Sequence, residues 1–334
     1  MIVKQNQANK ASIVPWVLLL VFTGIVAWLV LNRQFVIDTF RAAQFKPSDA
    51  IATIERDLDL TDSARQLFAA SQPELKSAEP FNQSCKQNLE ANNPILGCYT
   101  HQTIYVYDVT NPKLEGIEQT TAAHELLHAA YERLTVNQRE LLDKELAAIY
   151  SKLKDDKLAE RMEYYKKTEP GQEMNELHSI LGSEFSNLGN ALEGHYGKYF
   201  RNRTTIVEFN KKYSGVFTRI SDKMQQLVSQ INSSTAELNQ RINVHNQSIK
   251  KLQVDQEVFV NKNRRGEFTD EGKFNAEQQA LNRRSRALNS DRSALTASIE
   301  EVNALRKEYD VLVDEYNELS QSMNSSLAPQ PSLQ

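Results

Sequence analysis

A repeat of apolar residues in the last third of the chain places the strongest constraint on its fold. The residues that step by seven without interruption are Leu281, Leu288, Leu295, Val302, Tyr309, Tyr316 and Met323. An earlier stripe steps by three and four, through Phe217, Ile220, Met224, Leu227 and Ile231. Both spacings are typical of the seam between paired helices. The sequence therefore predicts two long helices in this region.

A short polar stretch, 261–275, separates the two seams. It reads NKNRRGEFTDEGKFN, with two glycines among its charges, so the helices can fold back on each other. We predict an antiparallel coiled-coil hairpin at 206–325, with irregular packing where the polar residues Ser234 and His245 enter the first seam. Arms of more than about 40 residues would reach roughly 60 Å or more. We expect the hairpin to meet an envelope protein partner and to supply no catalytic residue.

An uncharged apolar stretch lies near the N-terminus. Residues 13–31 read IVPWVLLLVFTGIVAWLVL, close to the roughly 20 residues that a helix needs to cross a bilayer. A cleavable signal peptide has a shorter apolar core and a cleavage site of small residues, and neither is clear here. We predict a transmembrane signal anchor at 13–31, a cytoplasmic N-terminus at 1–12 and a linker at 32–46. Residues 326–334 are predicted to be a disordered tail.

The two cysteines bear on which side of the membrane the rest of the chain occupies. Cys85 and Cys98 bracket a polar segment with the turn-forming residues Asn-Asn-Pro. A disulfide closing so short a loop would stabilise the fold by about 3 kcal/mol, and it would persist only in an oxidising compartment. The basic residues that flank the apolar stretch do not decide the orientation. A disulfide therefore predicts an extracytoplasmic location for residues 32–334, whereas two unrelated buried thiols would leave the location open.

The charge balance excludes one class of partner. The chain has 39 basic and 43 acidic residues among its 334, for a net charge of −4. A nucleic-acid-binding protein would show a basic surplus, so we expect no nucleic-acid partner. Only 11 glycines and 9 prolines interrupt the chain, and its mean hydropathy is −0.54. These values indicate long solvated helices beside a modest core.

Residues 47–205 combine helical and strand patterns. Two short helices are predicted within 47–68, where Thr61 or Asp62 is a natural N-cap. β-branched and aromatic residues at 95–98 and 103–109 predict a strand pair. Helical spacing returns at 120–155 and 173–200, with a break at Pro170-Gly171. We therefore predict a mostly α domain that contains a small β element.

This domain carries the motif HELLH at residues 124–128. Residues four apart share one face of a helix, so His124 and His128 can hold the same metal ion while Glu125 points into the same cleft. The pattern suits Zn²⁺, which acts as a Lewis acid and lowers the pKa of water, with Glu125 as the general base that passes the proton to a leaving amine. The flanking residues are small and apolar, and histidines on so buried a helix would be costly without a metal. The alternative is a helix whose histidines have this spacing by chance.

A catalytic zinc site needs a third protein ligand. The helical segment NELHSILGSEF offers three candidates, Glu176, Glu184 and His178. Its first five residues resemble the N-E-x-x-S segment of thermolysin-like gluzincins, which implies that Glu176 is the ligand. Those enzymes place an aspartate after the serine to orient a ligand histidine, but Ile180 stands here. Glu184 is left either to take that supporting role or to be the ligand itself.

A wider resemblance covers most of the domain. The segments LTDSARQLFAASQPEL, ILGCY, AAHELLHAAYERL, ELHSILGSE and HYGKYFRNR, followed by a helical hairpin, resemble an uncharacterised family of bacterial membrane-anchored metallopeptidases. The resemblance implies that both cysteines belong to the fold and that Glu176 and Glu184 both matter. It supplies no substrate.

Two further features fit a peptidase. The strand at 103–109 precedes the HELLH helix, where zincin folds keep an edge strand that pairs with an extended peptide. An ordinary core strand is the alternative. In HYGKYF, residues His195, Tyr196 and Tyr199 are candidate hydrogen-bond donors to the oxyanion that forms during peptide hydrolysis, although aromatic residues at such spacing are more often core.

The combined prediction is a single-pass, membrane-anchored, extracytoplasmic zinc metallopeptidase that acts on a peptide or protein substrate. Its fold is a mostly α, zincin-like domain at 47–205, followed by the hairpin. The alternative is a catalytically inactive zincin-like scaffold or adaptor at the cell envelope, which would have no need of Glu125. An intramembrane protease is excluded because HELLH lies about 90 residues from the apolar stretch, on a helix too polar to cross lipid.

Overall fold

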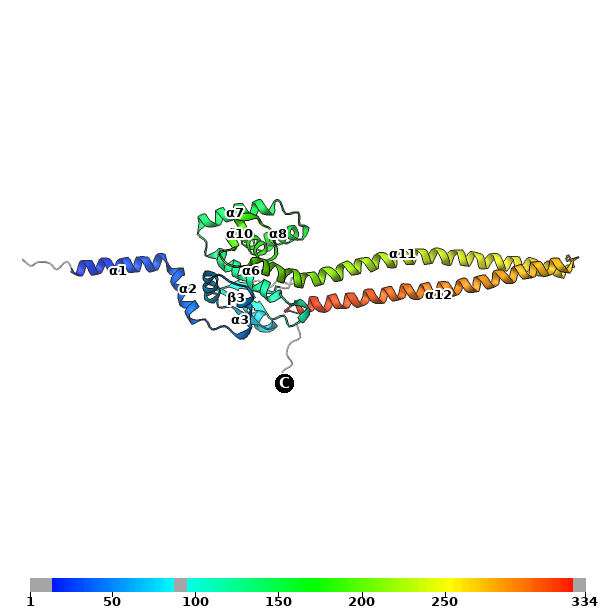
Figure 1. Cartoon of the computed structure of the whole chain (residues 1–334), viewed down its shortest axis with the longest axis horizontal. Helices are drawn as coiled ribbons and strands as arrows, with labels where there is room; N and C mark the ends of the chain where they lie inside the picture. The colour runs from blue at the N-terminus through cyan, green and yellow to red at the C-terminus, as the bar shows by residue number, and fades with distance from the viewer. Residues whose placement is uncertain (1–13, 87–94, 327–334) are drawn as a thin grey trace, which may run out of the picture. The chain divides into compact units, whose positions relative to one another are not determined.

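The computed structural model describes residues 14–86 and 95–326 and divides into two compact units. The first unit comprises the chain up to Ser214 together with the segment from Gln321 onward, and the second comprises Gly215–Ser320. Figure 1 shows the elements of both units. The predicted N-terminal segment 1–12 lies outside the described residues, as does the predicted tail apart from Ser326.

The first unit is mostly helical and contains a small sheet, as predicted. Its helices in chain order are α1 (Val14–Leu31), α2 (Arg33–Gln44), α3 (Asp49–Asp57), α4 (Asp62–Ala70), α5 (Ala78–Ser84), α6 (Ile117–Glu132), α7 (Val136–Tyr150), α8 (Asp156–Thr168), α9 (Glu173–Glu184), α10 (Gly189–Tyr196) and the first turns of α11 (Arg203–Arg264). Its strands are β1 (Glu74–Lys76), β2 (Gly97–Thr100) and β3 (Thr103–Tyr107).

The sheet has the order β1-β3-β2. Strand β3 pairs in parallel with β1 and antiparallel with β2, so that Tyr105 lies opposite both Glu74 and Cys98. The predicted strand pair is therefore confirmed as β2 and β3. The edge-strand prediction for 103–109 is wrong, because β3 lies between two other strands and β2 has one described neighbour. Strand β1 was missed because its three residues, Glu-Leu-Lys, are too few to show an alternating pattern.

Capping residues divide the helical stretches more finely than their apolar spacing suggested. The hydroxyl of Thr61 accepts a hydrogen bond from the Ala64 amide at 3.2 Å, which begins α4 as predicted. Thr135 and Gln138 form a capping box that begins α7, so the predicted helix at 120–155 is two helices. The predicted helix at 173–200 is likewise divided into α9 and α10, and Asn187 between them has a left-handed φ of 61°.

Helix α6 runs through the core of the first unit. Ala122, Ala123, Leu126 and Leu127 on this helix are all fully buried. Helix α9 packs closely against it at Gly182, where an added Cβ would lie 2.4 Å from the Leu127 Cδ1 atom. Glycine is needed at this crossing because the two helices leave no room for a side chain. This contact brings the residues of α9 next to the HELLH motif.

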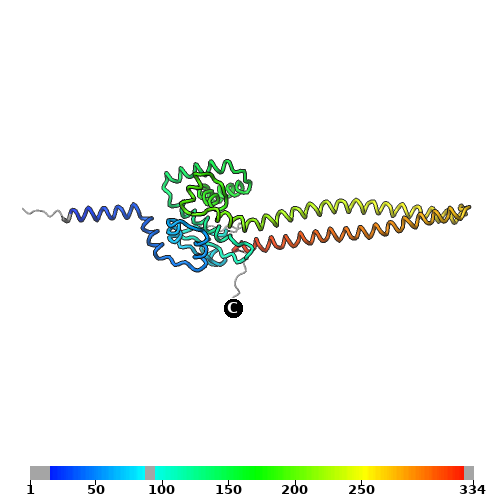
Figure 2. The backbone as a smooth tube through the Cα atoms, in the orientation of Figure 1, coloured from blue at the N-terminus to red at the C-terminus, as the bar shows by residue number. Residues whose placement is uncertain are grey.

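The second unit is an antiparallel pair formed by α11 and α12 (Glu271–Ser322), which run side by side in Figure 2. Ion pairs join Lys223 to Glu308 at 3.2 Å and Lys262 to Glu277 at 3.0 Å, which confirms the predicted hairpin. The helices extend further into the predicted connection than expected, since α11 continues to Arg264.

Polar residues of the two helices contact each other at the seam of this unit. His245 is buried, and its Nδ1 atom lies 2.6 Å from Asp291 Oδ2 on the facing helix. Leu238, Leu295 and Val302 form an apolar cluster nearby. The seam position Tyr316 is 38% exposed, with its ring edge-on to Phe217 on the other helix.

The N-terminal helices α1 and α2 bear on the predicted membrane anchor and on the predicted linker. No single helix of the described residues has the length and hydropathy of a membrane span, but α1 and α2 together do, with a bend of 75° between them. The transmembrane anchor at 13–31 therefore stays a prediction. The stretch 32–46, expected to be a linker, instead contains α2, which packs against α4.

Candidate metal centre

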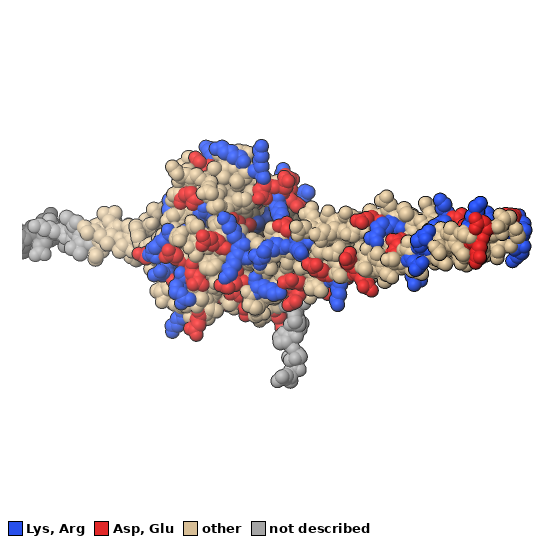
Figure 3. Space-filling view, turned by 45° about the vertical axis from the view of Figure 1, so that its right-hand side comes forward, with Lys and Arg blue, Asp and Glu red and all other residues tan. Residues whose placement is uncertain are grey.

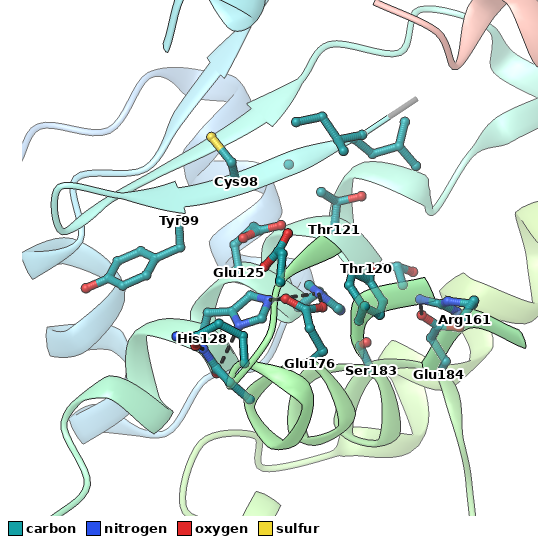
Figure 4. A pocket seen from close by; sticks show the side chains of 18 of the residues that line it. Cys98, Tyr99, Thr120, Thr121, Glu125, His128, Arg161, Glu176, Ser183 and Glu184 are labelled. Carbon is teal, nitrogen blue, oxygen red and sulfur yellow. Dashed lines mark hydrogen bonds and ion pairs between the residues drawn. The ribbon is translucent and has the colours of Figure 1, made fainter. Parts of the chain in front are cut away.

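Helices α6 and α9 bring together His124, His128 and Glu176. One ligand atom from each residue lies within 4.8 Å of the others. The His128 Nε2 atom is 3.0 Å from His124 Nε2 and 3.3 Å from Glu176 Oε1, while His124 Nε2 is 3.7 Å from Glu176 Oε2. The histidines meet because they are one turn apart on α6, and Glu176 joins them from the first turn of α9. Figure 4 shows His128 and Glu176 facing each other in this cluster.

The donor set fits a divalent transition metal. Two imidazole nitrogens and one carboxylate oxygen are the ligands of catalytic His₂Glu zinc sites. The Asn175 side chain donates from Nδ2 to Gln172 Oε1 at 3.2 Å, which leaves its Oδ1 to accept from His128 Nδ1 at 3.0 Å. With its proton on Nδ1, His128 presents the Nε2 lone pair to the cluster. Such a contact holds a ligand histidine in one tautomer and one orientation.

The electrostatics of the cluster keep its carboxylate ionised. Burial alone would raise the pKa of Glu176, but His128, His124 and Arg161 offset this effect and lower the pKa to about 2. The carboxylate of Glu176 is thus charged at neutral pH, which is the form that metal binding requires.

Glu125 lies beside the cluster and below strand β2. Its side chain is buried, and burial raises the pKa of its carboxyl, an effect that His128 and His124 offset only in part. At Gly97 of β2 an added Cβ would lie 2.6 Å from Glu125 Oε1 and 2.6 Å from Thr121 Cγ2. The strand can pass this close to the carboxylate only because residue 97 has no side chain.

A cavity of about 440 Å³ opens at the cluster. Strand β2 and the two residues before it form one wall, and α6 forms another (Figure 4). Away from the histidines the cavity is lined by Arg161, Tyr164, Tyr165, Glu184 and Tyr213. The site is therefore a candidate metal-binding cluster beside a cavity with a polar, partly aromatic lining.

The structure separates the three candidates for the third ligand. Glu184 lines the cavity but forms a two-point ion pair with Arg161, at 2.7 and 2.9 Å, outside the cluster. His178 is fully buried and lies with its Nε2 atom 2.9 Å from His195 Nε2. Only Glu176 of the three joins His124 and His128, because residues two and eight positions further along α9 point in other directions.

The predicted oxyanion donors do not reach the cavity. Tyr196 is fully buried, and its hydroxyl donates to the backbone carbonyl of His178 at 2.8 Å. His195 packs against His178 and against the Tyr199 ring. None of the three predicted donors lines the cavity. The oxyanion role is therefore wrong for Tyr196, whose aromatic ring and hydroxyl both serve the core.

Sequence reasoning missed several residues of the site. Asn175 accepts a hydrogen bond from His128, whereas the sequence pattern left this supporting role to Glu184 because Ile180 cannot fill it. The asparagine stands directly before the ligand in the NELHS segment, so a signal for it was present. The Arg161–Glu184 pair had no signal in the sequence, because it joins two helices through a contact that no local pattern reveals.

The cysteines join the site to the rest of the first unit. Cys85, at the end of α5, forms a disulfide with Cys98 in β2, which is the pairing that the sequence predicted. Cys98 also lines the cavity. The disulfide therefore attaches the wall of the cavity to α5.

Comparison with known proteins finds no match for this chain among family models, curated proteins or solved structures. The resemblance to gluzincins and to membrane-anchored metallopeptidases stays a prediction.

Proposed function

We propose that the chain is a zinc-dependent metallopeptidase that hydrolyses peptide bonds in a peptide or protein substrate. The observation that carries the proposal is the convergence of His124, His128 and Glu176 at a cavity that also holds the buried carboxylate of Glu125. Three ligands and an adjacent proton acceptor are the minimum that metal-assisted hydrolysis needs from a protein.

The residues of the chain divide the chemistry among them. Bound zinc would supply a Lewis acid that polarises the scissile carbonyl and lowers the pKa of water. Glu125 would take a proton from the attacking water and pass it to the leaving amine, a task for which its carboxylate lies beside the cluster. Asn175 would hold His128 in the ligating tautomer. Strand β2, rather than β3, is the edge that would pair with an extended peptide in the cavity.

The proposal includes a location. The apolar helix α1 and the Cys85–Cys98 disulfide support a chain anchored in the cell membrane with both compact units outside the cytoplasm. The hairpin of the second unit would then be available to an envelope protein.

Metal analysis and substrate cleavage test the proposal together. The purified full chain should carry about one zinc ion and should cleave an unfolded protein. His128→Ala should lose the zinc, whereas Glu125→Gln should keep the zinc and lose cleavage by roughly 10²-fold or more, because Glu125 moves protons and does not ligate. Full zinc occupancy in His128→Ala would contradict the metal site.

The same experiment separates the enzyme from the scaffold alternative. A wild-type chain that binds zinc but cleaves none of a set of unfolded substrates would favour an inactive scaffold. Unchanged cleavage by Glu125→Gln would instead show that the assigned proton acceptor is wrong.

A further inference from the structure

Helix α2 carries an exposed apolar face. The side chains of Phe35 and Phe40 are 59% and 63% exposed, and that of Ile37 is 41% exposed. At 100° per residue these three bound an arc on the outer side of the helix. Arg33 is the single charged residue in that arc, and Asp38, the one acidic residue of α2, lies outside it. Arg33 lies in the first turn of α2, at an angle between those of Phe40 and Ile37, and a long arginine side chain can extend from an apolar layer to the lipid headgroups. Exposed apolar side chains beside a basic residue are typical of a helix that lies in a membrane interface.

The geometry of the preceding helix suits the same surface. Helix α1 has exposed apolar side chains from Trp16 to Leu31, and in the view of Figure 3 it shows no charged atoms. The chain bends by 75° between α1 and α2. If α1 stands along the bilayer normal, a bend of this size brings α2 nearly parallel to the membrane surface.

The inner face of α2 is firmly attached to the first unit. Asp38 forms a two-point ion pair with Arg133 at the end of α6, with both distances 2.8 Å and both side chains 15% exposed. Arg41 donates to the carbonyl of Ala70 at 2.7 Å and to that of Gln102, in the turn between β2 and β3, at 2.9 Å. Helix α2 is therefore a fixed part of the fold.

These contacts continue to the cavity. Arg133 donates from Nη1 to the hydroxyl of Tyr99 at 2.9 Å, and Tyr99 lines the cavity from strand β2. A chain of contacts thus runs from Asp38 through Arg133 to Tyr99. Together with the Arg41 contact at the β2–β3 turn, it makes the position of β2 depend on the position of α2.

We propose that α2 is an interfacial helix that lies in the surface layer of a lipid bilayer through Phe35, Ile37 and Phe40, and that it holds the β2 wall of the cavity close to the lipid. The proposal rests on the membrane anchorage in the proposed function and narrows its substrate class to extended segments at the bilayer surface. A soluble peptide would bind in the same cavity less often, because the cavity would lie close to the bilayer surface.

A fluorescent label on α2 tests the proposal in the full chain. Both cysteines of the chain are in the disulfide, so Phe40→Cys introduces a single free thiol for an environment-sensitive dye. Phosphatidylcholine vesicles that contain a nitroxide-labelled lipid should quench this dye and shift its emission to the blue. Val254→Cys on α11, 58% exposed in the wild-type chain, is the matched control and should show neither change.

The outcomes of this experiment distinguish failure of the interfacial helix from failure of the membrane anchorage. Absence of quenching at residue 40 in a chain that floats with the vesicles would overturn the interfacial helix, as would equal quenching at residues 40 and 254. Failure of the chain to float with the vesicles would overturn the membrane anchorage and this inference together. Zinc content measured on the same sample does not depend on membrane binding. Failure of the metal site is therefore distinguishable from failure of the interfacial helix or of the membrane anchorage.

Hydrogen exchange tests the coupling to the cavity. In vesicles, the β2 amides of the Phe35→Ser/Phe40→Ser double variant should exchange at least about threefold faster than those of the wild type, because α2 would then be held by its contacts with the first unit alone and no longer by the bilayer as well. The α9 amides should exchange at the same rate in both proteins, which shows that the double variant is folded. Equal β2 rates would show that α2 does not restrain the wall and would overturn the coupling.

Discussion

At the residue scale, Asn175 is informative because it contacts the candidate ligand His128 without being a candidate ligand itself. Asn175 accepts a hydrogen bond from His128 Nδ1, and loss of such a contact typically weakens metal affinity by about 10- to 100-fold. Asn175→Ala should show this loss in a zinc competition assay with a chelator. Asn175→Asp keeps the acceptor and should retain most of the affinity, and equal weakening in both variants would contradict the orienting role.

Gly97 provides a second prediction at this scale. Gly97→Ala places a methyl group within 2.6 Å of Glu125 and Thr121, so the strand or the carboxylate must move, at a cost of about 1 to 3 kcal/mol. We expect the variant to keep zinc and to lose cleavage. Gly194→Ala is the control, because a Cβ there meets nothing within 4 Å. Normal cleavage by Gly97→Ala would show that the close approach does not position Glu125.

Glu118 gives the first unit a pH dependence. Burial raises the pKa of its carboxyl from 4.5 to about 7, although the Val109 amide donates to it. The folded chain holds this proton more strongly than the unfolded chain, so the stabilisation is complete below about pH 4.5 and is lost as the pH rises through about 7. The melting temperature of the wild type should therefore fall more between pH 5 and pH 8 than that of Glu118→Gln. Parallel curves for the two proteins would contradict this assignment.

At the scale of elements, the ion pair between Asp38 of α2 and Arg133 at the end of α6 is expected to be costly to break. Asp38→Ala leaves the largely buried Arg133 without its carboxylate, which typically costs about 3 kcal/mol. Glu308→Ala removes a pair in which both side chains are about half exposed, and it should cost less than about 1 kcal/mol. Chemical denaturation of both variants measures the difference. A cost for Asp38→Ala no greater than that for Glu308→Ala would argue that α2 is only loosely attached.

The elements also show what the sequence could and could not predict. The seam of α12 and the spacing of HELLH were readable because periodic residues reveal which face of a helix is buried. The division of 120–155 into two helices was readable as well, since Thr135 and Gln138 form a standard capping box. Strand β1, the Arg161–Glu184 pair and the docking of α2 depend on contacts between segments far apart in the chain. No local pattern predicts such contacts.

At the scale of the whole molecule, the first unit is expected to bind zinc without the second unit. The structure modifies the boundary of the hairpin, because the first turns of α11 belong to the first unit and supply Tyr213 to the cavity. Phe217 and Tyr316 lie in contact, so a short flexible linker can replace Gly215–Ser320. The shortened chain should keep about one zinc ion. Loss of zinc in a shortened chain with a normal circular dichroism spectrum would show that the hairpin contributes to the site.

The disulfide has a consequence for when the cavity is complete. Because Cys98 lies in the wall that passes over Glu125, a chain whose thiols are still reduced has this wall without its link to α5. Oxidation occurs only after a protein leaves a reducing compartment. If the chain is the exported peptidase that we propose, the wall of its cavity would be linked to α5 only after export, and a newly made chain with reduced thiols would have low activity.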